Sequence, residues 1–208
     1  MQRITAVVFD CDGVMFDTRA SNAAYYNTIL AHFDGPVLTD DQFAFVHMHT
    51  VDESLAHLFA DAKTLAQAQA YRRQVSYLPF LDRMEMEPDL TALLAWLRPT
   101  YRTAIATNRT DTMNRVLAVH GLTDVFDLVV CASDVPRPKP FPDCLQRVCD
   151  VFSLGPEQAI YIGDSKLDEM AAHAAGMPFV AYADPSLDAD FHIDHLCQVR
   201  EILEEAEG

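Results

Sequence analysis

The sequence contains no apolar run that approaches the ~20 residues a membrane-spanning helix requires, so we expect no membrane partner. It contains no C-x-x-C pair, and its cysteines number five, so we expect reduced thiols rather than a disulfide framework. Its first ten residues lack the basic and then apolar pattern of a secretory signal. Together these absences predict a cytoplasmic protein.

Positively charged residues are also scarce: 15 lysines and arginines stand against 31 acidic residues, which gives a formal net charge of −16. A surface this acidic repels polyanions, so nucleic acid is not an expected partner. It also repels a phosphorylated metabolite in solution. A phosphate site in this chain must therefore supply positive charge locally, from a metal ion, a lysine or backbone N–H groups.

What the sequence does contain is an alternation of short apolar runs and longer helical patterns. The runs are apolar at nearly every position, as expected for strands covered on both faces. This alternation predicts an α/β fold with a Rossmann-like, doubly wound parallel sheet. The expected strands are Ile4–Phe9, Thr103–Thr107, Leu128–Cys131, Ala159–Ile162 and Phe179–Tyr182, and the expected helices between them include Asp89–Leu97, Thr112–His120, Cys144–Phe152 and Lys166–Ala175.

The interval after the first strand breaks this alternation, because it holds only helical periodicity. We interpret residues 17–86 as an α-helical domain inserted into a core made of residues 1–16 and 87–208. The alternative is one continuous mixed domain, which the length of the interval disfavours, since βα connections are short. The helical patterns in the interval are Thr18–Phe33, Asp52–Ala60 and the apolar series Leu65, Ala68, Tyr71, Val75 and Leu78.

The first expected strand runs directly into Asp10-Cys11-Asp12-Gly13. Residues two apart in an extended backbone point to the same side, so the Asp10 and Asp12 side chains should converge where open α/β sheets bind ligands. Gly13 lets the chain turn away sharply. Two neighbouring carboxylates repel each other and require a cation or a shared proton. The alternative is an aspartate that merely caps a helix.

Two further strand ends carry groups suited to phosphate. Thr107 and Asn108 follow the second core strand, where a hydroxyl and free N–H groups can hold phosphate oxygens, although helix capping is the alternative. Lys139 lies between two prolines after the third strand, and the prolines hold it rigidly. A fixed ammonium suits a phosphoryl oxygen or a carboxylate pair, and a solvated lysine is the alternative.

The fourth core strand ends at Asp164, and Asp168 follows one helical turn later. Mg²⁺ takes few protein carboxylates and completes its coordination with water and phosphate oxygens, so Asp10, Asp164 and one backbone carbonyl would suffice. Helix capping is again the alternative. Each alternative is reasonable alone, but four strand ends that present Asp-x-Asp, Thr, Lys and Asp at one rim of a sheet favour a functional site.

The same segments resemble the motifs of the haloacid dehalogenase superfamily, in its phosphatase branch, and most closely the phosphoglycolate phosphatase and β-phosphoglucomutase group. The similarity lies in DCDGVMFDT, TNRT, RPKPFPD and YIGDSKLDEMAAHAAGM, which follow the family's order. It implies a Rossmann-like core, a helical cap inserted after the first motif, and Mg²⁺ as cofactor. Dehalogenases of the family lack the second acid, so the resemblance favours phosphoryl chemistry.

The resemblance also implies a role for each matching residue. Asp10 would be the nucleophile that forms an aspartyl-phosphate, and Asp12 would protonate the leaving oxygen and then deprotonate water. Asp10, Asp164 and the backbone carbonyl of Asp12 would bind Mg²⁺, and Asp168 would support either the metal or a neighbouring lysine. The transferring phosphoryl group would be held by Thr107, Asn108 and Lys139.

We therefore expect a Mg²⁺-dependent phosphohydrolase, monomeric or homodimeric, that cleaves a small phosphate monoester such as a phosphoglycolate-like compound or a sugar phosphate. A phosphomutase of the β-phosphoglucomutase type is one alternative, weakened because Asn22 lies about where such caps often hold a histidine. A phospho-acceptor or binding module without turnover is another.

Two features of the insert remain open from the sequence. His47 and His49 form an H-x-H pair that could suggest zinc, but no second pair completes a tetrahedral set, so we expect core or substrate-facing side chains. Arg72 and Arg73 could meet an anionic leaving group, although a solvated helix face is the first expectation.

Overall fold

The structure, a computed structural model, describes residues 3–207. Its centre is a six-stranded sheet in which neighbouring strands are parallel, in the order β5-β4-β1-β6-β7-β8. The predicted fold class is therefore confirmed. The strands are β1 (Ala6–Phe9), β4 (Arg102–Thr107), β5 (Leu128–Cys131), β6 (Ala159–Gly163), β7 (Phe179–Tyr182) and β8 (Phe191–Ile193).

The sequence did not indicate β8, and its composition explains why. The strand has only three residues at the edge of the sheet, where Phe191 is half-buried and His192 is exposed. It therefore lacks the continuous apolar run that identified the other five strands.

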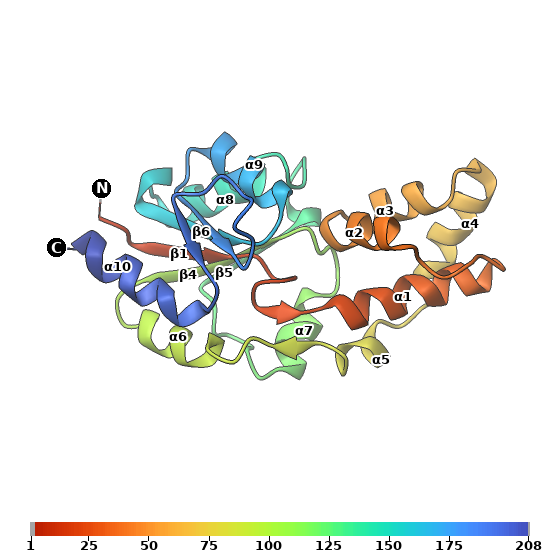
Figure 1. Cartoon of the computed structure of the whole chain (residues 1–208), viewed down its shortest axis with the longest axis horizontal. Coiled ribbons are helices and arrows are strands. Elements are labelled where there is room, and N and C mark those ends of the chain that lie inside the picture. The colour runs from red at the N-terminus through yellow and green to blue at the C-terminus, as the bar shows by residue number, and fades with distance from the viewer. Residues whose placement is uncertain (1–2, 208) are drawn as a thin grey trace.

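Helices cover both faces of the sheet (Figure 1). Successive residues of a strand point to opposite faces, so Val7 and Phe9 of β1 pack on one side and Ala6 and Val8 on the other. The side of Phe9 is covered by α6 (Leu90–Leu97), α7 (Met113–Val119) and α10 (Val199–Glu207), and the opposite side by α8 (Asp143–Phe152) and α9 (Lys166–Ala175).

The order of the strands reverses beside β1. The chain adds β4 and β5 on one side of β1 and then returns to add β6, β7 and β8 on the other. In sheets of this kind the carboxyl ends of the strands at the reversal form the usual ligand site. The functional residues should therefore gather at the carboxyl ends of β1, β4 and β6.

A helical region lies beyond those carboxyl ends (Figure 1). It begins after β2 (Phe16–Asp17) and ends at β3 (Glu85–Met86), and these two strands pair antiparallel. The chain therefore leaves the core and returns to it side by side. The helices of the region are α1 (Arg19–His32), α2 (Asp40–Met48), α3 (Val51–Leu58), α4 (Ala62–Arg72) and α5 (Leu78–Leu81).

Local signals start two of these helices. The hydroxyls of Thr39 and Thr50 accept hydrogen bonds from the N–H groups of Gln42 and Glu53, three residues on. The Gln42 and Glu53 side chains in turn accept from the N–H groups of the two threonines. Both helices thus begin with a capping box, which satisfies N–H groups that the helix itself leaves free.

The apolar series that begins at Leu65 is divided between two helices. Helix α4 ends at Arg72, and Leu78 begins the short helix α5. The second residue of α5 is Pro79, which lacks an N–H group and is tolerated only in the first turn of a helix. The break reorients the chain between the two helices.

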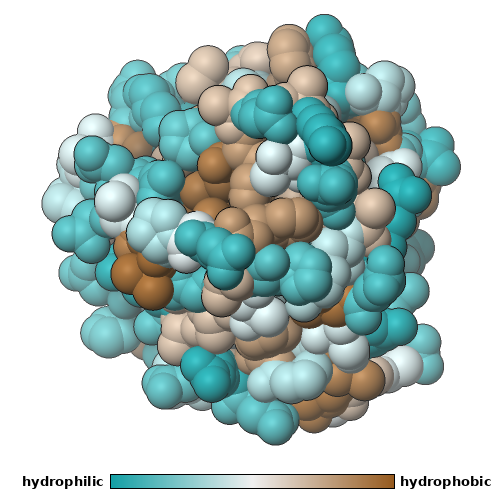
Figure 2. Space-filling view, turned by 90° about the vertical axis from the view of Figure 1, so that its right-hand side faces the viewer, coloured by the Kyte–Doolittle hydropathy of each residue, from teal (hydrophilic) through white to brown (hydrophobic). Residues whose placement is uncertain are grey.

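Figure 2 shows the helical region end-on. Hydrophilic side chains cover much of this face, with hydrophobic side chains between them. Within the described residues, no helix is long and apolar enough to cross a membrane.

Candidate active site

A cavity of about 350 Å³ lies between the carboxyl ends of the central strands and the helical region. Six of the seven predicted site residues line it, and the seventh, Asp168, contacts one of them. The structure therefore brings the predicted residues together in one place. The six that line the cavity are Asp10, Asp12, Thr107, Asn108, Lys139 and Asp164.

The loop after β1 forms the floor of this cavity. The Asp10 N–H group donates to the carbonyl of Ile162 in β6 (2.9 Å), which holds the end of β1 beside that of β6. Gly13 then turns the chain at a φ of +85°, in the left-handed region that favours glycine. A Cβ atom on Gly13 would lie 1.8 Å from Oδ2 of Asp164. Glycine is therefore required for this loop to approach Asp164.

Lys139 is buried and surrounded by polar partners. Its Nζ lies 2.8 Å from Oδ1 of Asp10 and 2.6 Å from Oδ1 of Asp168, and donates to the Tyr161 hydroxyl (2.9 Å). The Asn108 side chain fixes its backbone, because it accepts from the Lys139 N–H (2.9 Å) and donates to the Lys139 carbonyl (3.1 Å). The ammonium is thus held against Asp10.

Asp168 serves Lys139 rather than standing free for a metal. Its Oδ1 accepts from Lys139 and from the Tyr161 hydroxyl (2.6 Å), and its Oδ2 accepts from the Ser165 hydroxyl (2.5 Å) and N–H group (3.1 Å). Both carboxylate oxygens are therefore engaged. Of the two roles left open for Asp168 by the sequence, the geometry favours support of the lysine.

The carboxylates around Lys139 perturb one another. Burial raises the pKa of Asp10 to about 7, and the charge of Asp168 adds to this while Lys139 opposes it. Burial and the charges of Asp168 and Asp10 raise the pKa of Asp164 well above its ordinary value. Burial acts to lower the pKa of Lys139, but the neighbouring carboxylates outweigh it and raise that pKa. The neighbouring carboxylates therefore stabilise the charged form of Lys139.

The donor set suits a hard divalent cation. Carboxylate oxygens of Asp10, Asp164 and Asp168 lie within 4.8 Å of one another. Within residues 3–207, no hydrogen bond or ion pair holds the Asp164 carboxylate, so its oxygens are available. Because Asp168 is already engaged, Asp10 and Asp164 are the two side chains that fit Mg²⁺, which binds oxygen ligands and needs only one or two carboxylates.

Thr107 and Asn108 have different surroundings at the end of β4. The Thr107 hydroxyl accepts from the N–H of Arg109 (3.1 Å) and keeps its own hydrogen for a ligand in the cavity. The Asn108 side chain is engaged with Lys139 and also donates to the carbonyl of Met48 at the end of α2 (3.1 Å). Its amide therefore positions other groups instead of reaching toward a ligand.

Sequence reasoning missed the role of Arg109, although the residue lies inside the TNRT segment. Its Nε donates to Oδ2 of Asp12 and its Nη2 to Oδ1, both at 2.7 Å. Burial acts to raise the pKa of Asp12, but the Arg109 guanidinium outweighs it and lowers that pKa to about 2. The signal that could have identified this pair is Arg109 itself. It is a cationic residue two positions after the end of β4, and β4 pairs with β1, the strand that leads into Asp12.

The helical region reaches Asp12 through a second set of contacts. Asn22 Nδ2 donates to Oδ1 of Asp12 (3.4 Å) and lies 3.3 Å from Nδ1 of His47. The Tyr77 hydroxyl donates to Oδ1 of Asn22 (3.0 Å), and the Arg109 guanidinium lies over the Tyr77 ring. Asn22 of α1 thus contacts the expected acid directly, and His47 of α2 and Tyr77, which precedes α5, contact Asn22 in turn.

The expectations for the two histidines and the two arginines of the helical region have different outcomes. His47 and His49 both line the cavity, and neither belongs to a potential metal-binding group within residues 3–207. The expectation that Arg72 lies on a solvated face is wrong: its side chain is only 14% exposed and lines the cavity. The neighbouring Arg73 also lines the cavity but is exposed.

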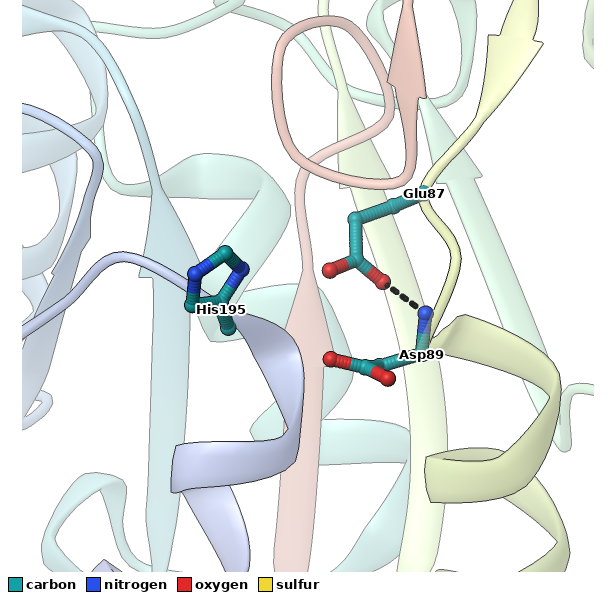
Figure 3. A group of neighbouring side chains, drawn as sticks. All are labelled: Glu87, Asp89 and His195. Atoms are coloured by element: carbon teal, nitrogen blue, oxygen red, sulfur yellow. Dashed lines mark hydrogen bonds between the residues drawn. The ribbon is translucent and has the colours of Figure 1, made fainter.

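A second group of potential ligands lies outside this cavity, in Glu87, Asp89 and His195 (Figure 3). The Glu87 carboxylate is buried and accepts hydrogen bonds from the N–H groups of Asp89 (2.7 Å) and Leu196 (3.3 Å). It thereby ties the start of α6 to the short 3₁₀ helix Leu196–Gln198. Those hydrogen bonds give Glu87 a structural role.

Comparison with known families gives one match over most of the chain. The family model for haloacid dehalogenase-like hydrolases matches residues 7–182. The matched span runs from β1, through the helical region, to the end of β7. It therefore includes every residue of the cavity floor described above.

Individual relatives agree with the family match. A phosphoglycolate phosphatase of Haemophilus influenzae is 38% identical over 188 residues, which cover 83% of this chain and 82% of that protein. The crystal structure of a subfamily IA hydrolase of the same superfamily from Geobacter sulfurreducens is 35% identical, covers 96% of both chains and has a TM-score of 0.79. A β-phosphoglucomutase from Clostridium difficile shares the fold at 20% identity, with a TM-score of 0.86 and coverage of 98% of this chain and 97% of that one.

Proposed function

Because this chain belongs to the haloacid dehalogenase-like hydrolases, we propose that it is a Mg²⁺-dependent phosphatase that transfers a phosphoryl group from a small phosphate monoester to Asp10 and then to water. The observation that carries the proposal is the contact of Asp10 with the buried Lys139 ammonium, next to the unpaired carboxylate of Asp164. Lys139, together with a divalent cation at Asp10 and Asp164, would neutralise the charge of a phosphate dianion at the point of attack. The relatives named above suggest a phosphoglycolate-like substrate, and a sugar phosphate is the other class.

In the proposed first step, a carboxylate oxygen of Asp10 attacks phosphorus and the bond to the leaving oxygen breaks. Bound Mg²⁺, held by Asp10, Asp164 and the Asp12 carbonyl, would supply charge neutralisation for the phosphoryl oxygens. The Thr107 hydroxyl would hold one of those oxygens, and Lys139 would hold another in place of its contact with Asp10. Asn108 would contribute through its backbone N–H, because its side chain is engaged in fixing Lys139.

Asp12 would move the protons. It gives a proton to the leaving oxygen in the first step and takes one from water in the second, when the aspartyl-phosphate is hydrolysed. The pair with Arg109 holds Asp12 in its ionised form, which is the form required for the second step. Before the first step, Asp12 must therefore take up a proton from solvent while it remains in contact with Arg109.

The helical region would act as a cap over this chemistry. We propose that residues 17–86 form the cap and that residues 1–16 and 87–208 form the core. Asn22 supports this role because it donates to Asp12 directly, and His47 and Tyr77 contact Asn22 in turn. A cap in this position would exclude bulk water from Asp10 while the phosphoryl group is transferred.

The test is phosphate release from p-nitrophenyl phosphate. We expect Mg²⁺-dependent turnover that stops in EDTA and returns when Mg²⁺ is added in excess. Full activity in the chelator would refute the metal assignment. With a sugar phosphate as substrate, release of free phosphate without an isomerised sugar phosphate separates the phosphatase from a mutase.

A further inference from the structure

The cavity concentrates the positive charge of an acidic chain. Although the protein has 15 basic and 31 acidic residues, the cavity lining holds five of the basic residues and only four of the acidic ones. Three of those acids, Asp10, Asp12 and Asp164, form the floor where Mg²⁺ is expected. The side of the cavity away from the floor is therefore net positive. The five basic residues are Arg72, Arg73, Arg109, Arg115 and Lys139.

Two of the buried cations are fully engaged by the catalytic machinery. Lys139 contacts both Asp10 and Asp168, and Arg109 makes a two-pronged pair with Asp12. Arg73 and Arg115 are exposed, so water screens their charges. Arg72 is the basic residue that is mostly buried in the cavity wall and not bound to the floor.

Arg72 is incompletely satisfied in its present surroundings. Its Nη2 pairs with Oδ1 of Asp52 at 3.2 Å, but the Asp52 side chain is 60% exposed, so this ion pair is weak. The guanidinium also interacts with the Tyr25 hydroxyl, but within the described residues its buried Nε has no hydrogen-bond partner. A buried N–H group without a partner is unfavourable, and native proteins rarely keep one without a reason. A ligand in the cavity would supply the missing acceptor.

We propose that the leaving group of the natural substrate carries a second anionic group, a carboxylate or a phosphate, and that Arg72 binds it. The guanidinium fork matches the paired oxygens of such a group, and Nε is one of the donors that forms the fork. The inference rests on the proposed phosphatase function and narrows its substrate. It favours a phosphoglycolate-like compound over a sugar phosphate with a neutral leaving group, since a neutral group would leave Nε unpaired.

The experiment compares three substrates in wild-type enzyme and in Arg72→Met. The substrates are 2-phosphoglycolate, whose leaving group bears a carboxylate; pyrophosphate, whose leaving group is a phosphate; and methyl phosphate, whose leaving group is neutral. We expect Arg72→Met to lower kcat/KM by about 100-fold for the anionic substrate the enzyme prefers, mainly through KM, because one charge-assisted interaction is lost. For methyl phosphate we expect a change of less than about 3-fold.

Two further variants control for fold and charge. Arg72→Lys keeps the charge but loses the fork, and should recover only part of the loss in KM. Lys63→Met removes a charge from an exposed residue of the same helix and should leave all three substrates unaffected. The preference of the wild-type enzyme between 2-phosphoglycolate and pyrophosphate shows whether the cavity binds a carboxylate or a phosphate on the leaving group.

The outcomes separate this inference from the proposed function. An equal loss on all three substrates in Arg72→Met, or a wild-type enzyme that prefers methyl phosphate, overturns the role of Arg72 and leaves the phosphatase proposal standing. Absence of Asp10-dependent phosphate release from every substrate overturns both.

Discussion

Within residues 3–207, two groups of side chains each bring three potential metal ligands within 4.8 Å of one another, but they differ in what else their ligand atoms contact. In the cavity floor, Asp168 is engaged by Lys139, Tyr161 and Ser165, which leaves Asp10 and Asp164 to face the cavity. In the second group, Glu87 is engaged by two backbone N–H groups and His195 is exposed (Figure 3).

The comparison teaches that closeness of ligand atoms does not by itself make a metal site. What distinguishes the cavity floor is the Asp164 carboxylate, which has no hydrogen-bond or ion-pair partner among the described residues. Neighbouring acids raise its pKa, and Gly13 lets the backbone approach it. A buried carboxylate whose oxygens already accept from backbone N–H groups gains little from a cation. We therefore expect the two groups to respond differently to the same substitutions.

The largest expected difference concerns turnover. Asp10→Asn should reduce phosphate release by at least about 10³-fold, because an amide cannot serve as the nucleophile. The same exchange in the second group, Asp89→Asn, should leave kcat within about 2-fold, since Asp89 lies outside the cavity. Steady-state assays with p-nitrophenyl phosphate measure both. Near-wild-type turnover in Asp10→Asn would remove Asp10 from its role.

A smaller difference is expected in how much Mg²⁺ stabilises the folded protein. Mg²⁺ at a hundred times its dissociation constant should stabilise the wild-type protein by about 2.7 kcal/mol and raise its Tm. Asp164→Asn should abolish most of this increase, whereas His195→Ala should retain it. Thermal melts with and without Mg²⁺ provide the measurement. If His195→Ala loses the increase and Asp164→Asn keeps it, the two groups have been assigned the wrong way round.

The smallest expected effect concerns the structural tie at Glu87. Glu87→Gln replaces one acceptor oxygen by a donor, so one buried N–H loses its partner, and the free energy of unfolding should fall by about 1–3 kcal/mol. Turnover should not change. Urea denaturation of the metal-free protein checks the first statement, and an unaltered midpoint would show that the tie contributes nothing.

The sequence predicted the cavity floor because the positions of its residues follow from the fold. Asp10, Lys139 and Asp164 each follow a buried strand, and the carboxyl ends of parallel strands meet at one rim. No knowledge of side-chain conformation is needed for that inference. The same reasoning left the partner of Asp168 open, since either a metal or Lys139 lies within its reach.

The sequence could not predict the contacts of the two arginines. Arg109 follows a strand end, but its long side chain could have pointed toward a ligand or back to Asp12, and only the packing against Tyr77 decides between them. The environment of Arg72 depends on where α4 ends and how the chain turns before α5. Both depend on contacts between segments distant in the sequence.

The pairing of Phe16 with Met86 and of Asp17 with Glu85 has a consequence for how this architecture can change over time. Paired antiparallel strands lie only about 5 Å apart, so the seventy or so residues between them begin and end at almost the same point. A segment attached in this way is free to lengthen, shorten or be exchanged for another without stretching the central sheet. New substrate preferences could therefore arise in the helical region beyond β2 and β3, while the phosphoryl chemistry at the central sheet stays unchanged.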